Sequence, residues 1–161
     1  MLMKKITNIE LESLTAQAQN SGRLRKNYNY HKELSDTLQR MLNAMEPFTY
    51  VQPHKHENPD KREAFVILTG RIVAIQFDMY GNIEDYIVLD RELGNYGAEF
   101  EEGVYHMLIS LKKGSVVYEV KDGPYIPIQD KDFAQWAPKE GEPGCEEYIH
   151  ELLKKMNLTN P

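Results

Sequence analysis

Two kinds of hydrophobic pattern divide this chain of 161 residues. Residues 7–20 carry apolar side chains at loosely helical spacing, and residues 32–45 carry a clearer helical pattern that ends at Pro47. A last amphipathic helix is predicted over residues 146–157, after a linker rich in Pro and Gly at residues 138–144. The apolar face of the second predicted helix consists of Leu34, Leu38, Met41, Leu42 and Met45.

Between Phe48 and Trp136 the pattern changes to short runs of Val, Ile, Tyr and Phe separated by Gly, Pro and Asn turn signals. Many short strands with frequent turns are typical of an antiparallel sandwich or barrel. The sequence therefore predicts one structural domain, mainly β, in three segments. These are a helical N-terminal arm at 1–47, a barrel at 48–137, and a linker with a short C-terminal helix at 138–161.

Composition and charge narrow the class of protein. The net charge is −6 and no basic stripe is visible, which argues against a nucleic-acid partner. No apolar run approaches the ~20 residues that a membrane-spanning helix needs, and the N-terminus lacks the apolar stretch of a signal peptide. The lone cysteine, Cys145, cannot form an internal disulfide. We therefore expect a soluble, cytoplasmic protein with neither nucleic-acid nor membrane partners.

Histidines and one carboxylate stand out within the predicted strands. Alternation along an extended segment puts His54 and His56 on one face and turns Lys55 away. Glu63 opens the next apolar run, where it shares a face with Phe65. A carboxylate on an apolar face is costly to bury unless a cation compensates it.

His106 completes this set from a third apolar segment, where it shares a face with Leu108. Three histidines and a carboxylate are a mixed nitrogen and oxygen donor set that suits Zn, Fe, Mn, Ni or Cu. Ordinary buried histidines are the alternative, but the combination with a carboxylate favours one divalent transition metal. The predicted metal ligands are His54, His56, Glu63 and His106.

A candidate pair for proton transfer follows the third segment. Alternation places Glu119 and Lys121 on the same strand face. If that face points inward, the pair lines the metal site and suits general acid and base catalysis. If it points outward, the pair is an exposed ion pair of little consequence. The sequence leaves both orientations open.

A polar, basic cluster precedes the predicted barrel, and arginine suits bidentate capture of phosphate or carboxylate. Such a clamp would fit a sugar phosphate or a nucleotide sugar, although a solvated surface is the simpler interpretation. Four aromatic residues could offer flat surfaces to a sugar ring, namely Tyr50, Tyr105, Tyr125 and Trp136, although aromatic side chains more often serve packing. The candidate substrate-binding residues are Arg23, Arg25, His31, Arg40, Tyr50 and Tyr125.

The order of the predicted ligands resembles the two sequence motifs of the cupin superfamily. The first comprises the two close histidines, Glu63 and Gly70, and the second comprises Gly97, Gly103 and His106. The resemblance implies a double-stranded β-helix, a small jelly-roll barrel that holds one metal. Six residues separate His56 from Glu63, a longer gap than usual, so that Glu57 is a weaker alternative ligand.

A closer resemblance covers roughly residues 22–140. It rests on the stretches 23–31, 39–44, 49–56, 77–78 and 119–125, which look like the WbuC family of cupin-fold metalloproteins. Members of that family are associated with bacterial O-antigen and surface-polysaccharide gene clusters. The resemblance implies a fold, a metal and a carbohydrate context, but no particular reaction.

Three functions are compatible with these features. The first is a metal-dependent isomerase or epimerase of a sugar, sugar phosphate or nucleotide sugar in bacterial surface-polysaccharide (O-antigen, lipopolysaccharide) biosynthesis. The others are a non-haem iron dioxygenase, and a non-catalytic module that binds a small sugar or carboxylate. Because the predicted helices have apolar faces, we also expect a homodimer.

Overall fold

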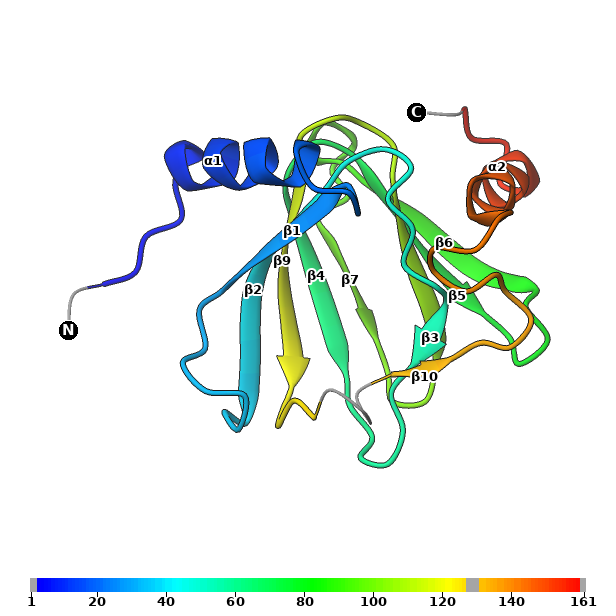
Figure 1. The fold of residues 1–161 in the computed structure, drawn as a ribbon, viewed down its shortest axis with the longest axis horizontal. Helices are drawn as coiled ribbons and strands as arrows, with labels where there is room; N and C mark the ends of the chain where they lie inside the picture. Colours follow the sequence, from blue (N-terminus) through cyan, green and yellow to red (C-terminus); the bar gives the residue numbers. More distant parts are fainter. Residues whose placement is uncertain (1–2, 127–130, 160–161) are drawn as a thin grey trace.

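Two antiparallel sheets of five strands form the body of the protein (Figure 1). The structure, a computed structural model, describes residues 3–126 and 131–159. The strand order of the first sheet is β1 (Arg25–Asn29), β2 (Leu38–Met45), β9 (Ser115–Asp122), β4 (Glu63–Thr69) and β7 (Gly97–Phe100). The strand order of the second is β10 (Asp132–Phe133), β3 (His54–Lys55), β8 (Tyr105–Ser110), β5 (Ile72–Phe77) and β6 (Ile83–Leu89).

This arrangement confirms the predicted fold class, a mainly β jelly-roll barrel with a helix near each end of the chain. One hydrophobic cluster lies between the sheets, since it joins Phe65 and Val117 of the first sheet to Ile72, Ala74 and Leu108 of the second. None of the helices in the described ranges is long and apolar enough to cross a membrane.

The prediction of a helix over residues 32–45 was wrong. Residues Leu38–Met45 form strand β2, which pairs with β1 on one side and β9 on the other. Leu42 faces outward into the cluster under the N-terminal helix, whereas Met45 faces inward into the cluster between the sheets. Because both faces of β2 are covered, its apolar residues do not alternate cleanly, and their spacing imitates a helix. The sheet accordingly begins at Arg25, well before Phe48.

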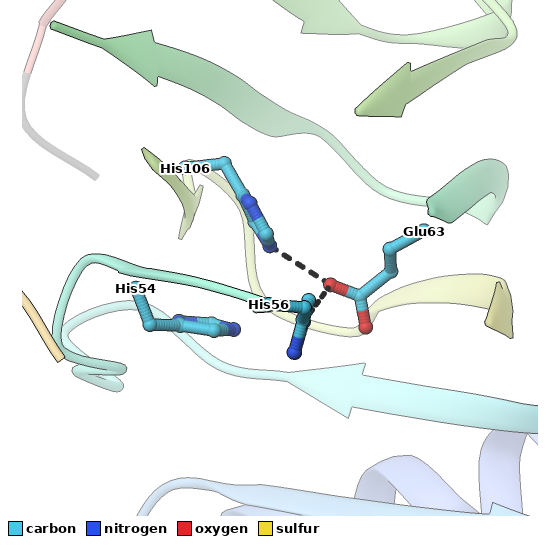
Figure 2. A group of neighbouring side chains, drawn as sticks. All are labelled: His54, His56, Glu63 and His106. Carbon is cyan, nitrogen blue, oxygen red and sulfur yellow. Dashed lines mark hydrogen bonds and ion pairs between the residues drawn. The ribbon is translucent and has the colours of Figure 1, made fainter. Parts of the chain in front are cut away.

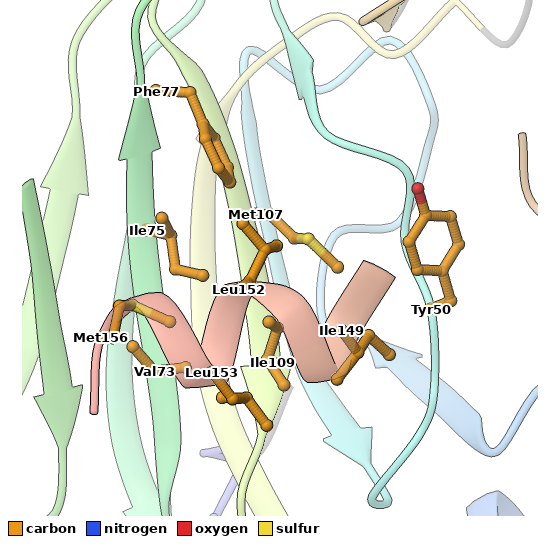
Figure 3. Packing of buried hydrophobic residues seen from close by; sticks show 10 residues of the cluster. All are labelled: Tyr50, Val73, Ile75, Phe77, Met107, Ile109, Ile149, Leu152, Leu153 and Met156. Atoms are coloured by element: carbon orange, nitrogen blue, oxygen red, sulfur yellow. The ribbon is translucent and has the colours of Figure 1, made fainter. Parts of the chain in front are cut away.

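The two helices cover the outer faces of the two sheets. Helix α1 (Asn8–Gln19) confirms the first predicted helix, and its Leu11, Leu14 and Ala18 pack on β2 and β9. Helix α2 (Cys145–Lys155) confirms the last predicted helix. Its buried side chains, drawn in Figure 3, pack against β5 and β8 and include Ile149, Leu152 and Leu153.

Candidate metal centre

The four predicted ligands come together inside the barrel (Figure 2). Strand β3 pairs with β8 so that His54 lies opposite His106, while His56 follows β3 directly and Glu63 begins β4. All four side chains are buried, and one donor atom from each lies within 4.8 Å of the others. The described residues therefore contain a donor set that could hold one metal ion.

Two of the histidines are oriented by backbone carbonyl groups. His54 Nδ1 lies 3.0 Å from the carbonyl oxygen of Gln52, and His106 Nδ1 lies 2.9 Å from that of Val104. A carbonyl oxygen only accepts, so each Nδ1 carries the hydrogen and each Nε2 presents a lone pair to the site. His54 Nε2 is buried and has no hydrogen-bond partner among the described residues. His54 Nε2 thus has an unshared lone pair that points into the site, as a metal ligand must.

Glu63 supplies further evidence for a cation. Its Oε2 lies 2.8 Å from His106 Nε2 and 3.3 Å from His56 Nε2. In neutral His106 that nitrogen is an acceptor, as is the carboxylate, so a proton or a metal ion must offset their repulsion. Two adjacent ligands of one ion, each bonded at ~2.1 Å, lie about 3 Å apart at a right angle. The observed separations fit such a pair.

The electrostatics of the site agree with these donor states. Burial lowers the pKa of His54 well below its usual value, reinforced by the charge of Lys131, so that the imidazole stays neutral. Burial opposes ionisation of Glu63, but its close contacts with His106 and His56 and the charge of Lys121 outweigh it and hold the pKa of Glu63 well below its ordinary value. Neutral imidazoles and an ionised carboxylate are the forms that bind metals.

The alternative ligand Glu57 lies outside this group. Its carboxylate pairs with Lys55 at 2.6 Å, and its side chain is 38 % exposed. The long gap after His56 is therefore accommodated by the loop to β4, and Glu63 remains the carboxylate of the cluster.

A cavity of about 810 Å³ opens beside the donor atoms, and its lining includes His54, Glu63 and His106. Much of the remaining wall is the inner face of the first sheet, where alternate residues of β2 point into the cavity. The polar residues along this wall include Asn27, Asn29, Gln39, Asn43, Glu119 and Lys121.

Glu119 and Lys121 point inward, which decides the orientation that the sequence left open. Both side chains are buried and line the cavity. Asn43 Nδ2 donates a hydrogen bond to Glu119 Oε2 at 3.0 Å, and Lys121 Nζ lies 3.8 Å from Glu63 Oε1. Burial, together with the charge of Glu63 and a hydrogen bond with it, raises the pKa of Glu119 to about 8. The pair thus lies directly beside the candidate metal centre.

The predicted substrate-binding residues divide into two groups. Arg23, Arg25, His31 and Tyr125 line the cavity, and Lys121 Nζ lies 5.5 Å above the Tyr125 ring. The other two predicted residues, Arg40 and Tyr50, are not part of its lining.

Arg40 and Tyr50 are placed elsewhere by the sheet. Arg40 alternates with Gln39 and Met41, both of which line the cavity, so it lies on the opposite face of β2. Tyr50 is buried, and its hydroxyl donates a hydrogen bond to the Pro138 carbonyl at 2.7 Å. Its ring packs in the cluster beneath α2, so it serves packing (Figure 3).

Sequence reasoning did not single out several residues of the cavity, among them Asn29, Gln39, Asn43 and Glu140. Gln39 and Asn43 were hidden by the helical interpretation of residues 32–45. Read as a strand, the same residues place Gln39, Met41, Asn43 and Met45 on one face. No local signal pointed to Glu140, because its partners lie more than a hundred residues earlier in the chain.

A family model described as "Domain of unknown function (DUF6016)" matches residues 6–89, more than half of the chain. The chain belongs to this family. The match includes His54, His56 and Glu63, whereas His106 lies beyond its end. No curated protein sequence matches the chain.

Several solved structures have a fold similar to that of this DUF6016 chain. The L-ribose isomerase of Cellulomonas parahominis with L-ribose has a TM-score of 0.53 and 15 % identity over 73 % of this chain and 72 % of that one. The L-ribose isomerase of Acinetobacter sp. DL28 with L-ribose has a TM-score of 0.52 and 13 % identity over 69 % and 70 %. The protein TT1209 from Thermus thermophilus has a TM-score of 0.51 and 17 % identity over 76 % and 97 %. At these identities the likeness concerns the fold.

Proposed function

We propose that the protein is a metal-dependent cupin that isomerises or epimerises a carbohydrate. The observation that carries this proposal is the buried donor cluster at the wall of a polar cavity, with Glu119 and Lys121 directly beside it. His54, His56, Glu63 and His106 would hold a divalent metal, which would supply Lewis-acid polarisation of a substrate oxygen.

Glu119 is the group that moves a proton in this proposal. Isomerisation or epimerisation through an enediol or enolate removes a proton from a carbon and returns one, and a carboxylate fixed beside that carbon can do both. The hydrogen bond from Asn43 orients Glu119, and burial keeps bulk water from the carboxylate. Lys121 is placed to stabilise negative charge that develops on a substrate oxygen.

The shape and lining of the cavity support a carbohydrate substrate. Its volume of about 810 Å³ lies in the upper part of the usual range of ligand sites. Amide side chains such as Asn27, Asn29 and Asn43 offer both donors and acceptors, which suits sugar hydroxyl groups. Two proteins of similar fold are L-ribose isomerases with L-ribose bound, which is a precedent for this chemistry on such a barrel.

The biological context is the finer part of the proposal. The resemblance to the WbuC family supports a role in surface-polysaccharide (O-antigen) biosynthesis, with a sugar phosphate or nucleotide sugar as substrate. A cytoplasmic location and a homodimer stay predictions of the sequence.

The test begins with purified full-length protein, whose bound metal is measured by elemental analysis. The protein is then incubated in D₂O with sugars, sugar phosphates and nucleotide sugars, and NMR follows deuterium entry at carbon. We expect metal-dependent incorporation into at least one substrate class. Protein that retains its metal and exchanges no carbon-bound hydrogen in any class would contradict the proposed reaction.

Two other functions use the same donor set. Iron bound by three histidines and a carboxylate also suits oxygen activation, so oxygen uptake after iron loading would favour a dioxygenase. A sugar-binding module without catalysis would show stabilisation by sugars in thermal melts without any deuterium exchange.

A further inference from the structure

We propose that Arg23 and Arg25 form an anion-binding subsite of the cavity that Glu140 occupies in this structure, and that a phosphate or carboxylate group on the sugar substrate displaces Glu140. This inference rests on the proposed carbohydrate function and names its substrate class. The preferred substrate would then be an anionic sugar rather than a neutral one.

The two arginines hold the Glu140 carboxylate from two directions. Arg23 donates from Nε and Nη2 at 2.7 and 2.9 Å, and Arg25 Nη2 donates to both carboxylate oxygens at 2.7 Å. Planar guanidinium groups that converge on one carboxylate have the geometry by which proteins recognise carboxylate and phosphate. Glu140 thus shows that this pair of side chains is arranged to accept an oxyanion.

Arg25 would keep its orientation without Glu140. Its Nη1 donates to the Tyr50 carbonyl oxygen at 3.0 Å and to Thr49 Oγ1 at 3.3 Å, and the side chain is 12 % exposed. Thr49 Oγ1 in turn donates to the Arg23 carbonyl oxygen at 2.7 Å. Burial lowers the pKa of Arg25, because a charged guanidinium loses hydration there. A buried, anchored cation requires an anionic partner, which either Glu140 or a ligand can supply.

Glu140 can leave this group more readily than Arg25 can. Its side chain is 35 % exposed, whereas that of Arg25 is far less so. It lies between β10 and α2 in the segment that contains Gly141 and Gly144, both with positive φ angles. Withdrawing Glu140 would therefore move a surface turn without opening a hydrophobic cluster.

One cavity connects this subsite to the candidate metal centre. Arg23, Arg25 and Glu140 line the same cavity as His54 and His106. Lys26 and Lys131 also line it and add positive charge. A ligand could thus place a sugar hydroxyl near the metal donors and an anionic substituent on the arginines. A simpler view holds that Glu140 only fastens the segment before α2, and binding measurements separate the two.

The first experiment is calorimetric titration of metal-loaded, full-length protein with glucose, glucose 1-phosphate, glucuronate and inorganic phosphate. Glu140→Gln should bind the anionic probes about tenfold more tightly or better, since it removes a competing charge. It should leave the affinity for glucose unchanged. The matched control is Glu142→Gln, which removes a carboxylate two residues away that contacts the Lys139 amide instead. Equal anion affinities in the two variants would overturn the proposal.

The second variant tests whether Arg25 binds the anionic group. Arg25→Gln should weaken binding of the anionic probes about tenfold or more, because it removes charge-assisted hydrogen bonds, and should leave glucose binding unchanged. Arg91→Gln removes the same charge from an exposed residue outside the cavity lining and is the control. Comparing the affinities for glucose 1-phosphate and glucuronate shows whether the subsite prefers a phosphate or a carboxylate group.

Hydrogen exchange on the wild-type protein tests the displacement itself and requires no variant to fold. Saturating glucose 1-phosphate should speed amide exchange in residues 139–144, whereas glucose should not. Unchanged exchange on binding would contradict displacement of Glu140. If anionic and neutral sugars bind equally, the subsite is refuted while the carbohydrate function stands. If phosphate binding depends on Glu140 and Arg25 but no sugar binds, the subsite stands and the carbohydrate function fails.

Discussion

Asn43 Nδ2 donates a hydrogen bond to Glu119 Oε2 at 3.0 Å, from strand β2 to strand β9. Asn43 lies opposite Val117 in the strand register, so the bond runs diagonally to the next inward residue of β9. It holds the Glu119 carboxylate at the wall of the cavity that contains the metal donors. A buried carboxylate beside Glu63 needs such a partner to keep one orientation.

Replacing Glu119 should abolish catalysis while sparing the metal. Glu119→Gln keeps the size of the side chain and an acceptor for Asn43 but cannot take up a proton. We expect solvent deuterium exchange into the substrate to fall by about 10²- to 10⁴-fold. Metal content by elemental analysis should match that of the wild type. A variant that loses both metal and activity would show a structural role for Glu119 instead.

Removing one metal donor should weaken metal binding and its effect on stability. His54→Ala deletes a lone pair that has no other partner among the described residues. Metal affinity should fall at least about tenfold, and the rise in melting temperature on adding metal should shrink accordingly. His150→Ala is the matched control, since His150 lies on α2 outside the donor cluster. Equal metal affinity in the two variants would exclude His54 as a ligand.

Gly70 should tolerate no side chain. It has a φ angle of +79° in the turn between β4 and β5, and an added Cβ would lie 2.5 Å from the Ser115 Cα. Gly70→Ala should therefore reduce the free energy of unfolding by about 2 kcal/mol or more, measured by urea denaturation. Gly22→Ala is the control, because nothing lies within 4 Å of the added Cβ and the backbone there is unstrained. If Gly70→Ala lowered the free energy of unfolding only slightly, the prediction would be wrong and the turn would adjust to a side chain.

The Asp90 carboxylate should make stability depend on pH in the acid range. Its Oδ1 accepts the Glu92 amide at 2.9 Å and its Oδ2 accepts Arg71 Nε at 2.6 Å, and these contacts lower the pKa of Asp90. A carboxyl pKa that is lower in the folded state stabilises the fold above the unfolded pKa, and this stabilisation is lost as the pH falls through the folded value.

Asp90→Asn keeps the acceptor for the Glu92 amide but loses the charge beside Arg71. We expect the variant to be less stable than the wild type by about 1 kcal/mol at pH 7. The difference should narrow as the pH falls below about 4. Asp60→Asn, in the exposed loop before β4, is the control, and its stability should equal that of the wild type at every pH. A constant difference across this range would contradict the linkage.

The metal donors could be predicted from sequence because their chemistry is local. Alternation along His54-Lys55-His56 and the apolar neighbours of Glu63 and His106 already favour a shared cation, because these features depend on a few neighbouring residues. The helix predicted over residues 32–45 failed for the opposite reason. Leu42 and Met45 lie on opposite faces of β2, and both are buried because α1 covers the face that a simpler sheet leaves to solvent.

The sequence by itself determined the mainly β barrel, the helices near the two ends and the set of four candidate donors, since hydrophobic periodicity and residue chemistry act over a few neighbours. Only the tertiary structure decided that Glu119 and Lys121 point inward, that Arg40 lies on the opposite face of β2, and that Glu140 meets Arg23 and Arg25. These depend on strand register and on contacts between residues far apart in the chain. Such contacts form only when the sheets pack, and no local pattern records them.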